Sequence, residues 1–423
     1  MLFKSFYFSF ILYLVISLFA CKNKPSIPQF NINVEVNDLN FGNYTPGKYS
    51  YNNHEIFTKE INNPFKIKYR GNASAHAPKK SFSLKFSTKI SLDNSSPHKK
   101  WKLNAEYIDK TFMRNKLSYD LFRSFSKGNI SPKITYLTVN INGNYNGLYT
   151  LLKRVDSDYL KLNKNDTNAI IFKQPPISYS TEKHANKHKR LISYSNKAIF
   201  YKEFSAKAKN KLIKEAYYNQ RYPNIYKSDK TYIIHELTDF IFNSKDIDFK
   251  NEKIFNSFFN INNIIDWHLL LLLSNNQDGL IKNFYIYRTG TNQPFLFSPW
   301  DYDHGYGRDG DGELNLNSFI NTKRVGLLNR LLKTNAFNYK KKLLKKYLLL
   351  KRKNILTAKN INSMIDKNIT TIQPYIVENE KKWPIDSVQY LQGSNFNNEI
   401  LLMKNWVKKR LPKVENYLRK LQN

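Results

Sequence analysis

Alternation of apolar and polar residues dominates the chain from 29 to 85, in the period-two pattern of β-strands. The apolar positions of three such runs are Phe30, Ile32, Val34 and Val36; Phe65, Ile67 and Tyr69; and Phe82, Leu84 and Phe86. Two further β-rich runs, 134–141 and 145–152, flank Asn142-Gly143, a dipeptide typical of tight hairpins. We therefore predict that the N-terminal part of the chain is rich in β-structure.

Helical spacing replaces the alternation from 101 to 126, so a helix is predicted after the sheet. Residues 175–245 are polar and weakly periodic, and we interpret them as an insertion with some helix. From Asn260 onward the pattern is mostly helical, apart from strand-like runs at 284–287 and 294–297. The prediction is an α+β protein of two lobes, a β-rich N-terminal lobe at 29–174 and a mainly helical C-terminal lobe at 175–423.

The first twenty residues have the pattern of an export signal. Lys4 precedes an uncharged run, 5–20, that is too short to span a bilayer comfortably. The run ends at Ala20-Cys21, which resembles the lipid-attachment site of bacterial lipoproteins. We predict a signal peptide at 1–20, lipidation of Cys21, a tether at 21–28 and a membrane-anchored protein in the periplasm or on the cell surface. The alternatives are a signal cleaved elsewhere and an uncleaved anchor.

Charge is the unusual feature of the composition. The 423 residues include 68 Lys and Arg but only 33 Asp and Glu, a formal net charge of +35. This charge predicts attraction to an anionic partner: nucleic acid, a membrane or glycan surface, a nucleotide, or an acidic protein. Zinc-finger spacing and other nucleic-acid motifs are missing from the sequence, and the export signal argues against nucleic acid as a partner. The single Cys excludes an intramolecular disulfide framework.

Side chains that suit phosphoryl transfer gather between 275 and 313. Asp278 and Asn283 have the spacing of a protein-kinase catalytic loop, in which the Asp accepts the proton of the acceptor hydroxyl and the Asn binds a metal ion. Asp301 and Asp303 follow the next strand-like run, where a kinase holds magnesium. Because phosphoryl transfer depends on positioning and on neutralised charge, this order of oxygen ligands predicts a phosphotransfer site.

Four blocks, in this order, resemble the spore coat protein H (CotH) kinase family, a set of atypical secreted kinases. The blocks are Arg70-Gly71-Asn72-Ala73-Ser74 with the Lys-rich 78–86; Trp101-Lys102-Leu103 with 109–116; Asn142-Gly143 with 144–149; and Asn276-Gln277-Asp278, Asn283 and Trp300-Asp301-Tyr302-Asp303. The resemblance covers about 27–411. It implies an atypical protein-kinase-like two-lobed fold and an enzyme that uses ATP, with Mg²⁺ or Mn²⁺, to phosphorylate an unknown protein substrate.

The resemblance also implies roles for the acidic block. Asp278 corresponds to the catalytic-loop Asp, and Asp301 to the metal-binding Asp of the family. Asn283 would bind a second metal ion, and Asp303 would be a further ligand or a neighbouring group.

Basic residues of the N-terminal lobe would bind the nucleotide. The resemblance places the Arg70 turn over the phosphates, with Lys80 or Lys85 pairing with them. We favour Lys85, with Lys79 and Lys80 as close competitors. Arg114, on the predicted helix, would face the cleft.

Lys153 departs from the family pattern, which commonly has a Glu at this position. The reversed charge would disfavour ATP binding if that Glu contacts the nucleotide. A rival hypothesis is therefore a non-catalytic, pseudokinase-like surface lipoprotein that binds an anionic glycan, lipid or protein partner.

Overall fold

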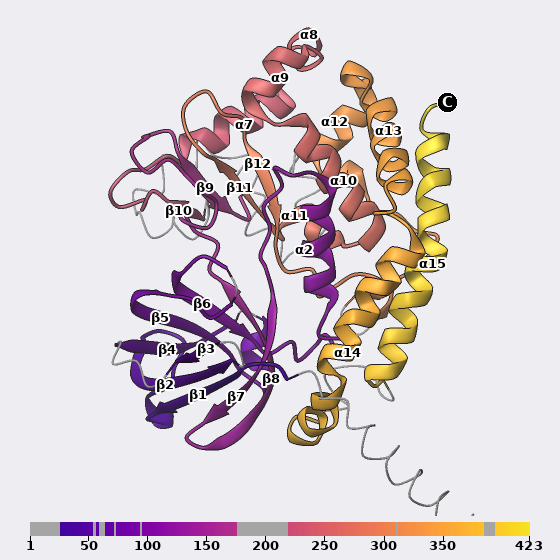
Figure 1. Ribbon diagram of the computed structural model, residues 1–423. Coiled ribbons are helices and arrows are strands. Elements are labelled where there is room, and N and C mark those ends of the chain that lie inside the picture. Colours follow the sequence, from indigo (N-terminus) through magenta and orange to yellow (C-terminus); the bar gives the residue numbers. More distant parts are fainter. Residues whose placement is uncertain are drawn as a thin grey trace, which may run out of the picture.

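The computed structural model describes residues 26–53, 56–58, 64–71, 73–93, 95–175, 219–309, 312–384 and 394–423. The predicted signal peptide, Cys21 and most of the predicted tether lie outside these residues, as does 176–218 of the predicted insertion. The described residues form a mixed α+β fold with a β-rich N-terminal part and a helical C-terminal part (Figure 1), which confirms the predicted class. None of the helices in these ranges is long and apolar enough to cross a membrane.

The N-terminal part is a β-sheet that closes on itself. Its strands are β1 (Gln29–Val34), β2 (Thr45–Asn53), β3 (Ile56–Thr58), β4 (Phe65–Arg70), β5 (Ser81–Ile90), β6 (His98–Asn104), β7 (Thr135–Ile141) and β8 (Asn144–Lys153). The described strands follow the order β1-β7-β8-β6-β5-β4-β2-β3, and β1 also pairs with β2, which closes a barrel. β1 and β7 are parallel, and the other neighbouring strands are antiparallel.

The alternation seen in the sequence fills this barrel. Phe30, Ile67, Leu84 and Leu103 are buried inside it, because every second side chain of a strand points to the same face. The hairpin predicted between β7 and β8 is confirmed, with Asn142 and Gly143 at φ 50° and 80°.

The helix predicted over 101–126 is wrong at its start. Residues 101–104 belong to strand β6, which pairs with β5 and β8, and helix α2 (Arg114–Phe125) begins only at Arg114. The physical reason is that Trp101 and Leu103 alternate with Lys100 and Lys102, so one face of this segment fits the barrel interior.

A second, smaller sheet lies within the C-terminal part. Its described strands follow the order β10 (Gln220–Tyr222), β9 (Ile170–Lys173), β11 (Phe284–Arg288) and β12 (Leu296–Pro299). β9 precedes the boundary predicted at 174, yet it pairs with β11 and so belongs to this sheet. The strands predicted at 284–287 and 294–297 are confirmed as β11 and β12, with the second shifted by two residues.

Helices surround this sheet and extend to the C-terminal end (Figure 1). They are α7 (Tyr232–Phe242), α8 (Asp246–Phe249), α9 (Glu252–Phe258), α10 (Ile261–Ser274), α11 (Gln277–Ile281), α12 (Gly326–Thr334), α13 (Tyr339–Arg352), α14 (Ala358–Lys382) and α15 (Phe396–Lys420). Short pieces η1 (Val36–Asp38), η2 (Ala73–His76), η3 (Thr322–Arg324), η4 (Ala336–Asn338), β13 (Arg308–Asp309) and β14 (Gly312–Glu313) complete the described elements.

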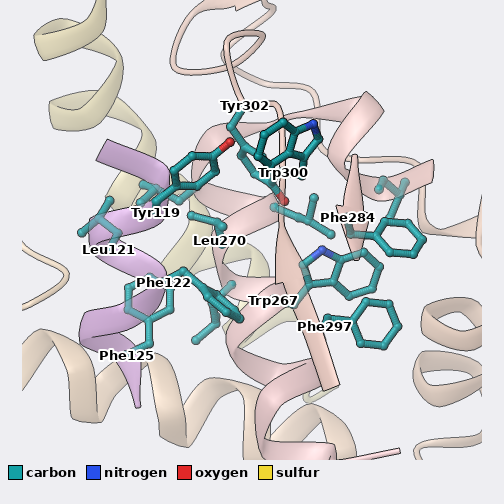
Figure 2. Close-up of a cluster of buried hydrophobic side chains, with 14 of the residues drawn as sticks. Tyr119, Leu121, Phe122, Phe125, Trp267, Leu270, Phe284, Phe297, Trp300 and Tyr302 are labelled. Atoms are coloured by element: carbon teal, nitrogen blue, oxygen red, sulfur yellow. The ribbon is translucent and has the colours of Figure 1, made fainter. Parts of the chain in front are cut away.

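Helix α10 is the centre of the second core. It is buried along almost its whole length, and the Trp267 ring stacks on Phe297 of β12 with ring centroids 4.5 Å apart. Figure 2 shows Phe122 and Tyr119 of α2 on the other side of this cluster, near Leu270. Helix α2 therefore connects the N-terminal part of the chain to the core that carries the acidic block.

The barrel and the helices also meet at the end of α14. The side-chain oxygen of Asn379 accepts hydrogen bonds from the Leu148 N–H, at 3.0 Å, and from the Lys79 ammonium, at 2.9 Å. The Trp383 indole donates to the Asn146 carbonyl at 2.8 Å. These contacts hold the barrel against the helical part, next to the site.

Candidate functional site

Asp278 lies in the first turn of α11, directly after the buried helix α10. Asn275 ends α10 in a left-handed conformation, with φ 55°, and Asn276 caps α11 by accepting the Gly279 N–H at 2.7 Å. The Asp278 side chain is 35% exposed and pairs with the Lys282 ammonium at 3.0 Å. A Cβ at Gly279 would lie 2.8 Å from the Tyr302 ring, so this turn requires glycine. The carboxylate therefore stands at an accessible edge of a rigid core.

The hairpin of β11 and β12 brings Asn283 next to Asp301. Phe284 pairs with Pro299, and the Trp300 N–H donates to the Asn283 carbonyl at 3.1 Å. The Asn283 amide nitrogen donates to the Asp301 carbonyl at 2.8 Å. Its amide oxygen accepts from Gln174 at 3.3 Å, so in this arrangement both ends of the side chain are bonded within the protein.

One face of α2 holds the loop that carries Asp301 and Asp303. The Asp301 N–H donates to the Tyr119 hydroxyl at 2.9 Å, and the Tyr302 N–H donates to Asn115 at 2.6 Å. Figure 2 shows Tyr119 beside Tyr302 and Trp300. Asp301 itself has φ 61°, a left-handed conformation that Asp adopts more readily than most residues. Helix α2, which is far from this loop in sequence, therefore holds the loop in position.

Arg114 completes this arrangement from a buried position. Its Nε donates to the Gly305 carbonyl at 3.0 Å, and its other nitrogens pair with Asp109 at 2.5 Å and Glu399 at 2.8 Å. Glu399 also binds Arg308 at 2.5 Å. The side chain of Arg114 is only 1% exposed. Its donors are used within the protein, so it positions the loop through Gly305.

The predicted carboxylates influence their neighbours electrostatically. Burial and the negative charge of Asp301 raise the pKa of Asp303. Burial lowers the pKa of His304, but a hydrogen bond to Asp309 and the charges of Asp303 and Asp278 outweigh it, so that pKa is raised. Asp303 therefore lies within electrostatic reach of Asp301, and His304 lies within reach of both Asp303 and Asp278.

Asp301 and Asp303 fit a divalent cation. The charge of Asp301 makes ionisation of Asp303 more costly, and a cation between them would offset that cost; Mg²⁺ commonly takes one or two carboxylates plus phosphate oxygens. Within the described ranges no group of three or more His, Cys, Asp and Glu side chains is arranged to hold a metal ion. The Asn283 amide oxygen, the predicted ligand of a second metal ion, accepts one hydrogen bond from Gln174 and keeps a second lone pair.

A cluster of cations, which we call the Trp300 cluster, faces Asp301. Its members are Arg70, Lys102 and Lys173, whose charged groups lie 6.0, 4.0 and 5.2 Å from the Trp300 ring. Burial and the repulsion of neighbouring cations bring the pKa of Lys102 well below its usual value. Burial, and to a smaller extent nearby arginines, lowers the pKa of Lys173 to about 8.

The Trp300 cluster has the properties of an anion site. Asp301 raises the pKa of both Arg70 and Lys173, against the larger effect of burial. No salt bridge within the described part of the chain neutralises any of the three cations. Arg70, Lys102 and Lys173 are half-buried, and positive charge that is partly removed from water is costly unless it is paired. This arrangement therefore favours a bound group with several negative charges, such as a polyphosphate.

The lysines that the sequence analysis placed at the phosphates make other contacts within the protein. Lys80 donates to the Ala75 carbonyl at 2.8 Å, and Lys79 is buried between the Tyr149 and Phe112 rings. Lys85 is exposed on β5 and stands opposite Lys66 and Lys100 of the neighbouring strands. Of the predicted nucleotide-binding residues, the structure brings only Arg70 next to Asp301.

Three residues of the site were missed by sequence reasoning. Lys102 was missed because a helix was predicted over its segment. If that segment had been identified as strand β6, Lys102 would have been placed on the outward face of the sheet. Lys173 ends the apolar run 170–172 and carries no motif. Glu106 accepts from Thr150 at 2.6 Å and from Asn115 at 3.2 Å, and burial raises its pKa to about 7. No spacing in the sequence signals any of the three.

Lys153, the departure from the family pattern, is not part of this cluster. It lies 3.6 Å from Asp93 and donates to Ser95 and Ser96, with its ammonium 5.3 Å from the Trp101 ring. The reversed charge is therefore satisfied in a loop outside the Trp300 cluster.

Comparisons with known proteins agree with the geometry. A family model described as CotH kinase protein matches residues 67–414, which includes the acidic block and the Trp300 cluster. The inner spore coat protein H of Bacillus subtilis (strain 168) is 27% identical over 316 residues, which cover 74% of this chain and 77% of that protein.

Proposed function

The chain belongs to the CotH kinase protein family, and from this premise we propose that it is an atypical protein kinase that transfers the γ-phosphate of ATP to a protein hydroxyl. One observation carries the proposal: the half-buried cations of the Trp300 cluster, which form no salt bridge among the described residues, lie within electrostatic reach of Asp301, and Asp301 in turn acts on Asp303. Phosphoryl transfer needs both kinds of charge in one place, because the nucleotide is an anion and its metal ion is a cation.

The proposed roles follow from where each side chain lies. Arg70, Lys102 and Lys173 bind the phosphates of ATP, and Asp301 with Asp303 holds Mg²⁺ or Mn²⁺. The bound metal ion would supply charge neutralisation at the phosphates. The exposed edge position of Asp278 suits a group that orients an acceptor from solution.

The transfer itself is a displacement at phosphorus. The acceptor oxygen bonds to the γ-phosphorus while the bond from that phosphorus to the leaving oxygen of ADP breaks. Asp278 takes the proton that the acceptor hydroxyl releases. Arg114 and Glu106 do not touch the reacting atoms in this proposal, and they act by positioning Gly305 and Asn115.

The N-terminal sequence supports a location outside the cytoplasm. We propose that a lipid on Cys21 anchors the protein at the membrane and that its substrate is a protein in the same compartment. The name of the relative places that protein in a spore coat, a surface structure.

The test is transfer of labelled phosphate by the full chain, with Mg²⁺ or Mn²⁺, to itself and to candidate proteins. We expect Asp278→Ala and Asp301→Ala to lower the rate by about a hundredfold or more. Asp366→Asn, which removes a carboxylate from a surface pair with Lys404, should change the rate by less than about twofold. Absence of labelling with both metals, together with no nucleotide-induced shift in Tm, would refute the proposal.

A further inference from the structure

Three lysines lie side by side on three neighbouring strands of the barrel. Lys66 of β4 pairs with Lys85 of β5, and Lys85 pairs with Lys100 of β6. Residues that pair directly across antiparallel strands point to the same face, and like charges in that arrangement destabilise a sheet. Neither the hydrophobic core nor the register requires this row, since the apolar residues of these strands point inward.

Two more cations extend the row, and we call the set of five the basic face: Lys66, Lys68, Lys85, Lys100 and Arg154. Lys68 is two residues along β4 from Lys66 and donates to the Gly42 carbonyl at 2.8 Å. Arg154 follows β8 and its N–H donates to the Lys100 carbonyl at 2.9 Å. The basic face thus spans β4 to β6 and continues beyond the end of β8.

Acidic side chains do not neutralise the basic face in the described part of the chain. Asp156 and Asp158 act on Lys100 through their charges, without a salt bridge to it. Asp156 already binds His98 at 3.1 Å, and Asp158 already binds Lys89 at 3.1 Å. No salt bridge between described residues involves a member of the basic face.

The basic face leads into the Trp300 cluster. Lys68 and Lys102 both pair with Ser83, one from each side, so they lie in the next row along the same face. Arg154 contributes positive charge to Lys100 on one side and to Lys102 and Lys173 on the other. A chain lying on the basic face therefore continues directly to the place where phosphate is transferred.

We propose that the basic face docks an acidic segment of the protein that is phosphorylated. The inference rests on the proposed function, because it names the substrate class of the same site. A polypeptide is the occupant of choice because the docked molecule must also carry the acceptor hydroxyl into the adjoining site. Neighbouring strands lie about 4.8 Å apart, so the row of three lysines spans roughly 10 Å, a length that about three residues of extended chain cover.

Binding is tested first, with the full chain and a short fluorescent oligoglutamate peptide followed by anisotropy. Lys66→Gln with Lys100→Gln leaves Lys85 without its neighbours, and we expect the Kd to rise about tenfold, with the wild-type affinity falling as salt is added. The matched control is Lys341→Gln with Lys345→Gln on α13, where both lysines are exposed, and there the Kd should not change. Equal affinity in wild type and the Lys66/Lys100 variant would overturn the proposal.

Phosphate transfer is tested second, with two peptides that carry the same hydroxyl in an acidic or a neutral surrounding. Wild type should label the acidic peptide with the lower KM, and the Lys66/Lys100 variant should lose that preference while its kcat on the neutral peptide is retained. Equal KM for both peptides in wild type would also overturn the proposal. Removal of two mutually repelling charges should leave Tm unchanged or higher, which guards against misfolding as the cause.

Other anions and other failures give distinct results. If heparin or phosphatidylglycerol vesicles bind through Lys66 and Lys100 while oligoglutamate does not, the occupant is a glycan or a lipid and the proposal is wrong. Oligoglutamate binding can depend on these lysines while wild type transfers no phosphate to any protein. In that case the basic face is an acidic-peptide site, and the proposed kinase function is wrong. If phosphate transfer occurs and the Kd for oligoglutamate is the same in wild type and in the Lys66/Lys100 variant, only the docking proposal is wrong.

Discussion

Two groups of buried charge in this protein differ in how they are neutralised. Around Arg114, positive and negative side chains alternate, and Asp109 and Glu399 pair with it at 2.5 and 2.8 Å. Around Trp300, Lys102 and Lys173 are surrounded mainly by other cations, and Asp301 contributes negative charge to Lys173. Both groups lie beside the same loop, which the first group holds in place and the second group faces.

The difference separates a structural role from a binding role. A paired buried charge maintains geometry, and loss of one partner leaves the other charge uncompensated. Unpaired buried cations lower stability, so a protein retains them where a ligand supplies the missing negative charge. Mutations in the two groups should therefore affect different quantities, stability for the first and ligand affinity for the second.

The largest effect is expected from Arg114→Met. Its loss leaves Asp109 buried without its ion pair and frees the Gly305 carbonyl, so the free energy of unfolding should fall by about 3–5 kcal/mol. Urea unfolding followed by circular dichroism measures this. Lys351→Met, which breaks an exposed pair with Glu415, is the control and should cost less than about 1 kcal/mol. Equal losses in the two variants would mean that the buried pairs around Arg114 contribute no more than a surface pair.

Lys102→Met should show the opposite behaviour. Removal of a cation that other cations repel should not lower the free energy of unfolding. The Kd for ATP should nevertheless rise about tenfold to a hundredfold, the value of a hydrogen bond to a charged group. Calorimetric titration with the metal–nucleotide complex and urea unfolding give the two quantities. A destabilised Lys102→Met with unchanged nucleotide affinity would place Lys102 in the structural group instead.

The pKa of Lys173 predicts a pH effect of intermediate size. This pKa is lowered to about 8, so the side chain carries its charge below that pH and loses it above. The kcat/KM for ATP should therefore fall as pH rises above about 8, by at most about tenfold per pH unit. Lys173→Arg keeps its charge at every accessible pH, so its profile should stay flat there. An identical decline in both proteins would assign the titration to another group.

The smallest effect on transfer is expected at Lys153. Because this side chain binds Ser95, Ser96 and Asp93, Lys153→Gln should change the rate of phosphate transfer by less than about twofold. Its free energy of unfolding should fall by about 1–2 kcal/mol, since buried partners lose a hydrogen-bond donor. A large gain in nucleotide affinity in Lys153→Gln would show that the Lys153 charge disfavours ATP, and it would bring back the rival hypothesis of a non-catalytic protein.

Much of the fold was predictable because its signals are local. The alternation at Phe30, Ile67 and Leu84 identified strands, and Asn142-Gly143 identified a hairpin, since both depend only on neighbours in sequence. The closure of the barrel by β1 and β2 was not predictable, because strand pairing over long distances leaves no periodic trace. The same holds for β9, whose partner β11 lies more than a hundred residues later.

The two halves of the site differ in the same respect. Asp278, Asn283, Asp301 and Asp303 were found because one turn and one hairpin carry them all, so their order in the sequence reflects their nearness. The three cations of the Trp300 cluster come one each from β4, β6 and β9, and the Trp300 ring that they face comes from the segment after β12. Against 68 basic residues, no spacing distinguished Lys102 and Lys173 from Lys80 and Lys85.

By itself, the sequence determined the barrel strands β1, β4, β5, β7 and β8, the buried helix before Asp278, and the acidic block with its family resemblance. These features depend on contacts within about twenty residues, which a linear pattern records. Only the tertiary structure decided which cations face the carboxylates, that Arg114 positions the loop, and that Lys66, Lys85 and Lys100 stand in one row. Such decisions depend on which strands become neighbours, and strand pairing brings together residues that the sequence keeps apart.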